Sequence, residues 1–123
     1  MDELTKLETW LRSHHIPYER IDENPPEWAP RLDRHQICVP CFEPRKREWD
    51  AICHFGSYGY EDGLLEIYGE LVTEDDDDSV VGYLTAADVV KRVEAWLKRG
   101  KKNEKNEKQR RRNIRCLNKR MLW

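Results

Sequence analysis

The side chains best suited to chemistry in this chain are cysteines and histidines near its middle. Cys38 and Cys41 are two residues apart, which is the spacing of zinc-ligand and redox pairs. Cys53, with either His35 or His54, would complete a four-ligand zinc site across adjacent strands. No second Cys-x-x-Cys pair follows, and a redox pair belongs at the start of a helix. The pattern favours ordinary strand cysteines, so we predict no metal and no cofactor.

Carboxylates are the second chemical candidate, because four of them could gather a magnesium ion for a nuclease: Asp50, Glu61, Asp62 and Glu66. Such enzymes usually also place a basic residue near the metal, and no Lys or Arg occurs from residue 51 to residue 90. His54 falls on the same strand face as Asp50, but a hydrogen-bonded histidine is the commoner outcome. The chain has no phosphate-binding loop, serine-hydrolase or dinucleotide-binding motif. We therefore predict that it is not an enzyme.

The segment from residue 49 to residue 69 must position most of these groups. Residues 49–55 alternate, with Trp49, Ala51, Cys53 and Phe55 on one face, which predicts a half-buried strand. A second strand is predicted at residues 64–69. Three glycines interleaved with two tyrosines separate the two strands, and this composition predicts an aromatic loop.

The remaining elements follow from spacing. Residues 2–14 carry leucines at helical intervals, and residues 85–99 begin with a Thr-x-x-Asp capping box, so each segment predicts an amphipathic helix. Strands are predicted at residues 35–39 and 18–21, and loops at residues 22–34 and 70–82. We expect a two-layer α+β domain at residues 1–99, in which both helices cover one face of a small antiparallel sheet of three to four strands. A basic extension, helical or disordered, is predicted at residues 100–123.

Charge divides the chain sharply. Residues 98–123 hold 12 Lys and Arg and two Glu, a net charge of +10, whereas residues 1–97 carry −12. Such a division bears on partners rather than on fold. The acidic part could occupy the nucleic-acid-binding groove of another protein, with aromatic anchors, although acidic surfaces often serve only solubility. The predicted partner-binding residues are Trp28, Tyr58, Tyr60, Glu61, Asp62, Glu66, Tyr68, Glu74, Asp75, Asp76, Asp77 and Asp78. For Trp28 a lid over the edge of the core is the simpler expectation.

The basic end supports a different hypothesis. Its cations could neutralise phosphates in a sequence-independent manner, or the segment could be a solvated end. The residues that would bind nucleic acid are Arg110, Arg111, Arg112, Arg115, Lys119 and Arg120.

Four blocks of the sequence resemble small proteins encoded by prophages of gut Firmicutes. They are Arg-His-Gln-Ile at 34–37, Trp-Asp-Ala-Ile-Cys-His at 49–54, Gly-Ser-Tyr-Gly-Tyr-Glu-Asp-Gly-Leu-Leu-Glu at 56–66 and Val-Gly-Tyr-Leu-Thr at 81–85. The resemblance covers roughly residues 1–97 and carries no catalytic motif. It implies a mobile-element setting, in which small acidic proteins, among them anti-CRISPR proteins, often inhibit host defence enzymes.

Three functional hypotheses follow. The first is a non-catalytic inhibitor whose acidic aromatic surface occupies the groove of a host protein, most concretely a CRISPR effector nuclease. The second is a phage accessory protein that binds nucleic acid through the basic tail, and the third is a small zinc protein. The acidic start and the lack of a long apolar run predict a cytoplasmic protein without membrane contact.

Overall fold

Helix α1 (Glu3–Ser13) begins the domain at the predicted place. Its N-cap is Asp2, whose Oδ1 accepts a hydrogen bond of 2.7 Å from the Thr5 amide. The helix buries the leucines whose spacing predicted it, Leu4, Leu7 and Leu11. The computed structural model describes residues 1–100 of the chain, and the predicted extension lies almost entirely outside these described residues.

Helix α2 (Ala86–Arg99) closes the domain. The predicted capping box is present, because the Thr85 side chain accepts from the Asp88 amide and the Asp88 carboxylate accepts from the Thr85 amide. Val89, Val93 and Trp96 are buried on its inner face, as the spacing predicted. Leu97 was expected on the same face but is substantially exposed.

Between the helices runs an antiparallel sheet in which each strand pairs with the next along the chain. The strands are β1 (Glu19–Glu23), β2 (Arg34–Val39), β3 (Trp49–Ile52), β4 (Leu65–Gly69) and β5 (Val80–Leu84). In the central three strands Ala51 pairs with both Ile37 and Ile67. These residues face the helices, because side chains alternate between the two faces of a strand.

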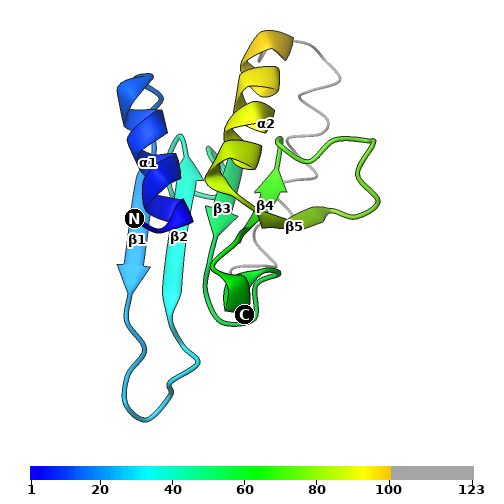
Figure 1. Cartoon of the computed structure of the whole chain (residues 1–123). Helices are drawn as coiled ribbons and strands as arrows, with labels where there is room; N and C mark the ends of the chain where they lie inside the picture. Colours follow the sequence, from blue (N-terminus) through cyan, green and yellow to red (C-terminus); the bar gives the residue numbers. More distant parts are fainter. Residues whose placement is uncertain (101–123) are drawn as a thin grey trace.

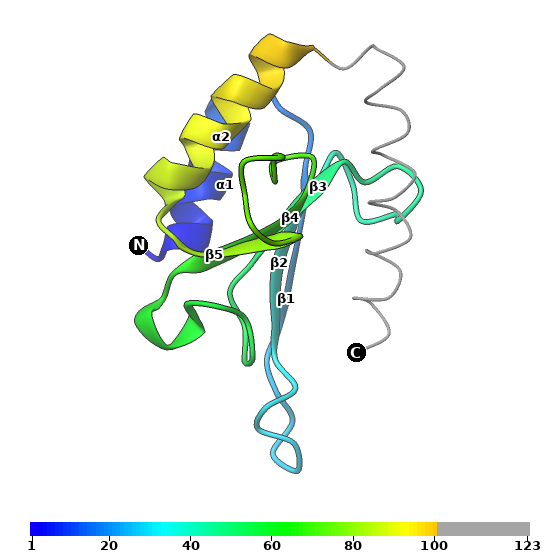
Figure 2. The same ribbon diagram turned by 90° about the vertical axis from the view of Figure 1, so that its right-hand side faces the viewer.

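Both helices lie on one face of the sheet, which gives the two layers seen edge-on in Figure 2. The first and last elements of the domain contact one another (Figure 1), and the Ala86 amide at the start of α2 donates to Glu3 Oε1 of α1 at 3.1 Å. Trp49 and Trp96 meet edge to face in the core between the layers, with ring centroids 6.2 Å apart. The predicted α+β class and helix placement are therefore confirmed.

The predicted sheet of three to four strands was too small, because the structure has five. The missing strand is β5, which lies inside and just beyond the segment predicted to be a loop. Strand β3 also ends at Ile52 instead of continuing to Phe55. Phe55 is consequently exposed, and the prediction that it shares the buried face of Trp49 was wrong.

No helix in the described part of the chain is long and apolar enough to span a membrane.

Candidate partner-binding site

The segment between β3 and β4, residues 53–64, carries the predicted aromatic loop. It contains a short 3-10 helix, η1 (Tyr60–Asp62), which begins and ends at glycines with positive φ, Gly59 at 97° and Gly63 at 69°. A side chain at Gly59 would meet Leu64 Cβ at 2.9 Å and Tyr83 Cα at 3.0 Å. Glycine is therefore required there both for its backbone conformation and for its size.

A tight turn fixes the beginning of this segment. Ser57 Oγ donates to the carbonyl of His54 at 2.7 Å, and the Ser57 amide donates to the same carbonyl at 2.9 Å. Asp33, at the end of the β1–β2 loop, accepts from the Phe55 amide at 2.9 Å. The aromatic loop is thus held to a neighbouring loop as well as to itself.

Tyr58 anchors the middle of the segment to the sheet through its backbone. Its amide donates to Glu66 Oε1 of β4 at 3.1 Å, and its carbonyl accepts from the Tyr83 amide of β5 at 3.2 Å. Gly82 permits this approach, because a Cβ at that position would lie 2.2 Å from the Tyr58 Cβ. The loop is therefore packed directly on the last strand.

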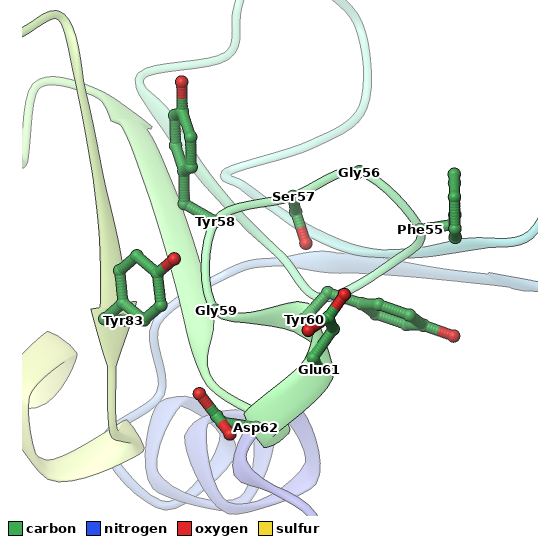
Figure 3. Close-up of a pocket in the computed structure, with 9 residues that line it drawn as sticks. All are labelled: Phe55, Gly56, Ser57, Tyr58, Gly59, Tyr60, Glu61, Asp62 and Tyr83. Carbon is green, nitrogen blue, oxygen red and sulfur yellow. The ribbon is translucent and has the colours of Figure 1, made fainter.

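The result is an open hollow of about 290 Å³ at this edge of the domain. Figure 3 shows Tyr58 and Tyr83 on one side of it and Phe55 and Tyr60 on the other. The lining consists of four aromatic residues, two carboxylates, a serine and two glycines: Phe55, Gly56, Ser57, Tyr58, Gly59, Tyr60, Glu61, Asp62 and Tyr83. Among residues 1–100, this lining includes two acidic side chains and no basic one.

The aromatic side chains of the hollow are available to a partner. Tyr58 is 54% exposed and Tyr83 is 62% exposed. Phe55 and Tyr60 contact each other edge to face, with ring centroids 6.1 Å apart. The guanidinium carbon of Arg31 lies 5.0 Å from the centroid of the Phe55 ring, which is a cation–π distance.

Strain marks the position of Tyr83. Its φ is +58°, in the left-handed region that a bulky residue rarely adopts. The pairing of β4 with β5 explains why, because Leu65 pairs with Leu84 and Ile67 with Val81, which leaves one extra residue in β5. Such a β-bulge redirects a side chain, and here it turns the Tyr83 ring toward the hollow.

The structure brings together four of the predicted partner-binding residues, Tyr58, Tyr60, Glu61 and Asp62, in one site. It adds two residues that the sequence analysis missed, Phe55 and Tyr83. Alternation had placed Phe55 in the core, and Tyr83 lay outside any predicted strand. The neighbouring glycine at position 82 was the only local signal that the backbone comes close to another segment there.

Trp28 lies elsewhere, in the β1–β2 loop that extends beyond the sheet at the bottom of Figure 1. It is 82% exposed, so the expectation that it forms a lid over the core was wrong. The loop that carries Trp28 contains three prolines and begins directly after Glu23, the last residue of β1. Leu32 in the same loop is also exposed.

Two predicted residues are buried rather than exposed. Glu66 and Tyr68 lie in β4 and point to the face of the sheet opposite the helices. Glu66 accepts from the Tyr58 amide, so it supports the aromatic loop from within. The prediction that these two side chains belong to an exposed binding surface was wrong, because β4 is a central strand.

The acidic run at the other end of β4 forms a separate patch. Its members are Glu74, Asp75, Asp76, Asp77 and Asp78, in the loop between β4 and β5. The five residues of β4 separate this loop from the hollow by roughly 16 Å, at about 3.3 Å per residue. The single acidic surface expected from the sequence is therefore two patches, a small aromatic one and a larger purely acidic one.

Asp76 has a structural role within its loop. Its carboxylate binds Arg92 of α2 through two contacts of 2.9 and 3.0 Å and accepts from the Thr73 amide at 2.7 Å. The Arg92 hydrogen bond and charge, with help from Thr73, lower the pKa of Asp76 to about 2. This carboxylate is thus committed to holding the loop against α2.

The carboxylates proposed for a magnesium site do not converge. Asp50 is fully buried and accepts from Gln36 Nε2 at 2.6 Å, with Arg47 Nη1 3.9 Å away. Glu61 and Asp62 are exposed in η1, and Glu66 binds the Tyr58 amide. Within residues 1–100 no group of three or more acidic, histidine or cysteine side chains is arranged to hold a metal ion.

The cysteines are divided by the sheet. Cys38 alternates with Ile37 and Val39 and so faces away from the helices, whereas Cys53 packs against the helix-side core. Burial raises the pKa of the Cys38 thiol to about 12, which disfavours the thiolate that metal binding and redox chemistry need. His54 Nδ1 accepts from the His35 amide at 3.3 Å, so its ring takes part in strand pairing.

The six predicted nucleic-acid-binding residues, from Arg110 to Arg120, lie outside the described part of the chain. Comparisons of the whole chain with models of protein families, with curated proteins and with solved structures found no match in any of the three.

Proposed function

We propose that this chain is a non-catalytic binding protein whose aromatic, acidic hollow engages a basic surface on a partner protein. The observation that carries the proposal is the lining of the hollow: four exposed aromatic side chains beside two carboxylates, on a loop fixed to β4 and β5 and, for Tyr83, on β5 itself. Exposed aromatic residues on a rigid support are typical anchors of protein interfaces. A preorganised loop also loses little conformational entropy on binding.

Net charge supports a basic partner. Residues 1–100 carry 12 Lys and Arg against 22 Asp and Glu, a net charge of −10. Long-range attraction of this size accelerates encounter with a positively charged groove. Protein surfaces that bind nucleic acid are positively charged and therefore suit an acidic partner. The resemblance to prophage proteins makes a CRISPR effector nuclease the concrete candidate. Binding there would exclude DNA or RNA and inhibit the enzyme.

The test is a direct binding measurement between the full chain and a purified host CRISPR effector nuclease, at about 0.05 and 0.2 M salt. We expect saturable binding that weakens with salt and competes with the nuclease's nucleic acid. The double variant Glu61→Gln, Asp62→Asn should bind several-fold more weakly. A matched control is Glu23→Gln, Glu27→Gln, which removes the same charge from the β1–β2 region. Binding that persists in the presence of saturating nucleic acid would reject the groove-occupying mechanism.

A second candidate is nucleic-acid binding through the basic end, which the net charge of +10 on residues 98–123 favours. Replacement of the six named Arg and Lys residues with Gln separates the two proposals in one gel-shift experiment. Under this candidate the replacement abolishes binding to DNA or RNA. Under the first, the variant still binds its partner protein.

A further inference from the structure

We infer that the hollow is a receptor for an arginine side chain, which the basic partner inserts between the two aromatic sides of the hollow, Tyr58 with Tyr83 and Phe55 with Tyr60. This deepens the proposed function and rests on it only for the identity of the partner. Three features of the described residues support it: the chemistry of the lining, the rigidity of the loop and the strained position of Tyr83.

The lining selects an organic cation. Aromatic faces attract cations through their quadrupole, and the neighbouring carboxylates Glu61 and Asp62 add charge attraction. A hard metal ion would need more oxygen ligands than two adjacent carboxylates provide, and no such cluster occurs among residues 1–100. At about 290 Å³ the hollow lies at the lower limit of small-molecule pockets, which suits a single side chain.

Guanidinium fits this lining better than ammonium. It is planar, stacks on aromatic rings and loses its weak hydration easily, whereas lysine carries a compact and strongly hydrated charge. The chain already contains such a contact at the rim, where Arg31 lies over the Phe55 ring at 5.0 Å. Arg31 is not among the residues that line the hollow, so the space between its two aromatic sides is left to an external side chain.

Tyr83 is placed for binding rather than for stability. Its ring is mostly exposed, so burial contributes little, yet its backbone occupies a left-handed conformation that is strained for a bulky residue. Gly82 and the hydrogen bond from the Tyr83 amide to Tyr58 maintain that conformation. The bulge thus holds Tyr83 next to Tyr58, on one side of the hollow, before any ligand arrives.

The experiment is a titration of the full, isotope-labelled chain with tetra-arginine and, separately, tetra-lysine peptides, followed by amide NMR shifts. We expect saturable shifts centred on the loop glycines and Tyr83, with tetra-arginine bound about two- to five-fold more tightly than tetra-lysine. Equal affinity for both peptides would overturn the inference. So would shifts centred on residues 74–78, since they would indicate attraction by charge alone.

Two variants make the test specific. Tyr83→Asn should remain folded, because Asn tolerates a left-handed backbone, and it should lose the preference for arginine. Tyr83→Phe should retain the preference, and so should the control Glu74→Gln, Asp75→Asn in the separate acidic patch. If tetra-arginine binds as expected while no nuclease does, the proposed function fails and the arginine receptor stands. If a nuclease binds equally well to Tyr83→Asn, the receptor fails and the proposed function stands.

Discussion

Single residues determine the shape of the hollow. Gly82 has no side chain where one would collide with Tyr58, and Tyr83 adopts a strained φ next to it. Both positions lie in a five-residue strand that no hydrophobic pattern revealed. Sequence analysis identified Tyr58, Tyr60, Glu61 and Asp62 as a group because they are adjacent in sequence. It missed Phe55 and Tyr83 because their roles depend on where β3 ends and where β5 bulges.

Substitution at Gly82 tests the packing of the aromatic loop. We expect Gly82→Asn to lower the free energy of unfolding by about 2–3 kcal/mol, because the new Cβ overlaps Tyr58 and forces the loop away from β5. Gly63→Asn is the matched control, since nothing lies within 4 Å of its Cβ position and Asn tolerates a φ of 69°. Urea denaturation of both variants measures the difference. Equal stabilities would contradict the close approach of Gly82 to Tyr58.

At the scale of elements, periodicity predicted what is buried and regular. Helices α1 and α2 and strands β2 to β4 carry apolar residues at the intervals their structures require, and all were placed within a few residues. Strand β5 was missed for two physical reasons. Its bulge breaks the period of two, and it follows directly after the acidic run, whose charge indicated an exposed loop.

The end of α1 offers a stabilising change. His15 has a φ of +55° and occupies the position where helices usually place glycine. Its amide donates to Arg12 and the Ile16 amide donates to Leu11, which together form a Schellman motif. His15→Gly should therefore raise the free energy of unfolding by about 0.5–1 kcal/mol. Thermal unfolding checks this, with His14→Gly as a control that should destabilise because His14 stacks on Trp10 at 3.9 Å.

The ion pair between Asp76 and Arg92 predicts a pH dependence for the β4–β5 loop. The folded pKa of Asp76 lies near 2, below its ordinary value of 3.8, so the contribution is fully present above about pH 4 and is lost as pH falls toward 2. We expect Asp76→Asn to destabilise the protein by about 1 kcal/mol at neutral pH, after allowance for partial exposure of the pair. Denaturation at pH 6 and pH 3 should show the difference between the two proteins shrinking. If the difference in the free energy of unfolding were the same at both pH values, the destabilisation would come from the lost hydrogen bonds alone.

At the scale of the whole molecule, the two acidic patches should act on different steps of binding. The run at residues 74–78 offers charge without aromatic anchors, whereas the hollow offers both. Charge at a distance mainly sets the rate of association, and close packing mainly sets the rate of dissociation. The concentration of acidic residues in the first part of the chain was evident in the sequence. That these residues form two separate patches could be seen only from the fold.

The separate effects of the two patches on association and dissociation can be measured with any basic partner that binds. Conversion of Glu74, Asp75, Asp77 and Asp78 to amides should slow association several-fold at low salt and leave dissociation nearly unchanged. The double variant Tyr58→Ala, Tyr83→Asn should instead speed dissociation and leave the association rate nearly unchanged. Asp76 stays unchanged in the first variant, so its bond to Arg92 is preserved. Surface plasmon resonance at two salt concentrations distinguishes the steps, and a dissociation effect from the first variant would refute this assignment.

The direct contact between the first and last helices also constrains how the chain can fold during synthesis. Each strand can pair with its predecessor as it emerges, since neighbours in the sheet are neighbours in sequence. The apolar layer stays only partly covered, by α1, until α2, the final described element, packs beside α1. A ribosome-bound chain that stops before residue 86 should consequently expose its sheet to chaperones, whereas one extended past residue 100, with enough further chain to clear the exit tunnel, should close.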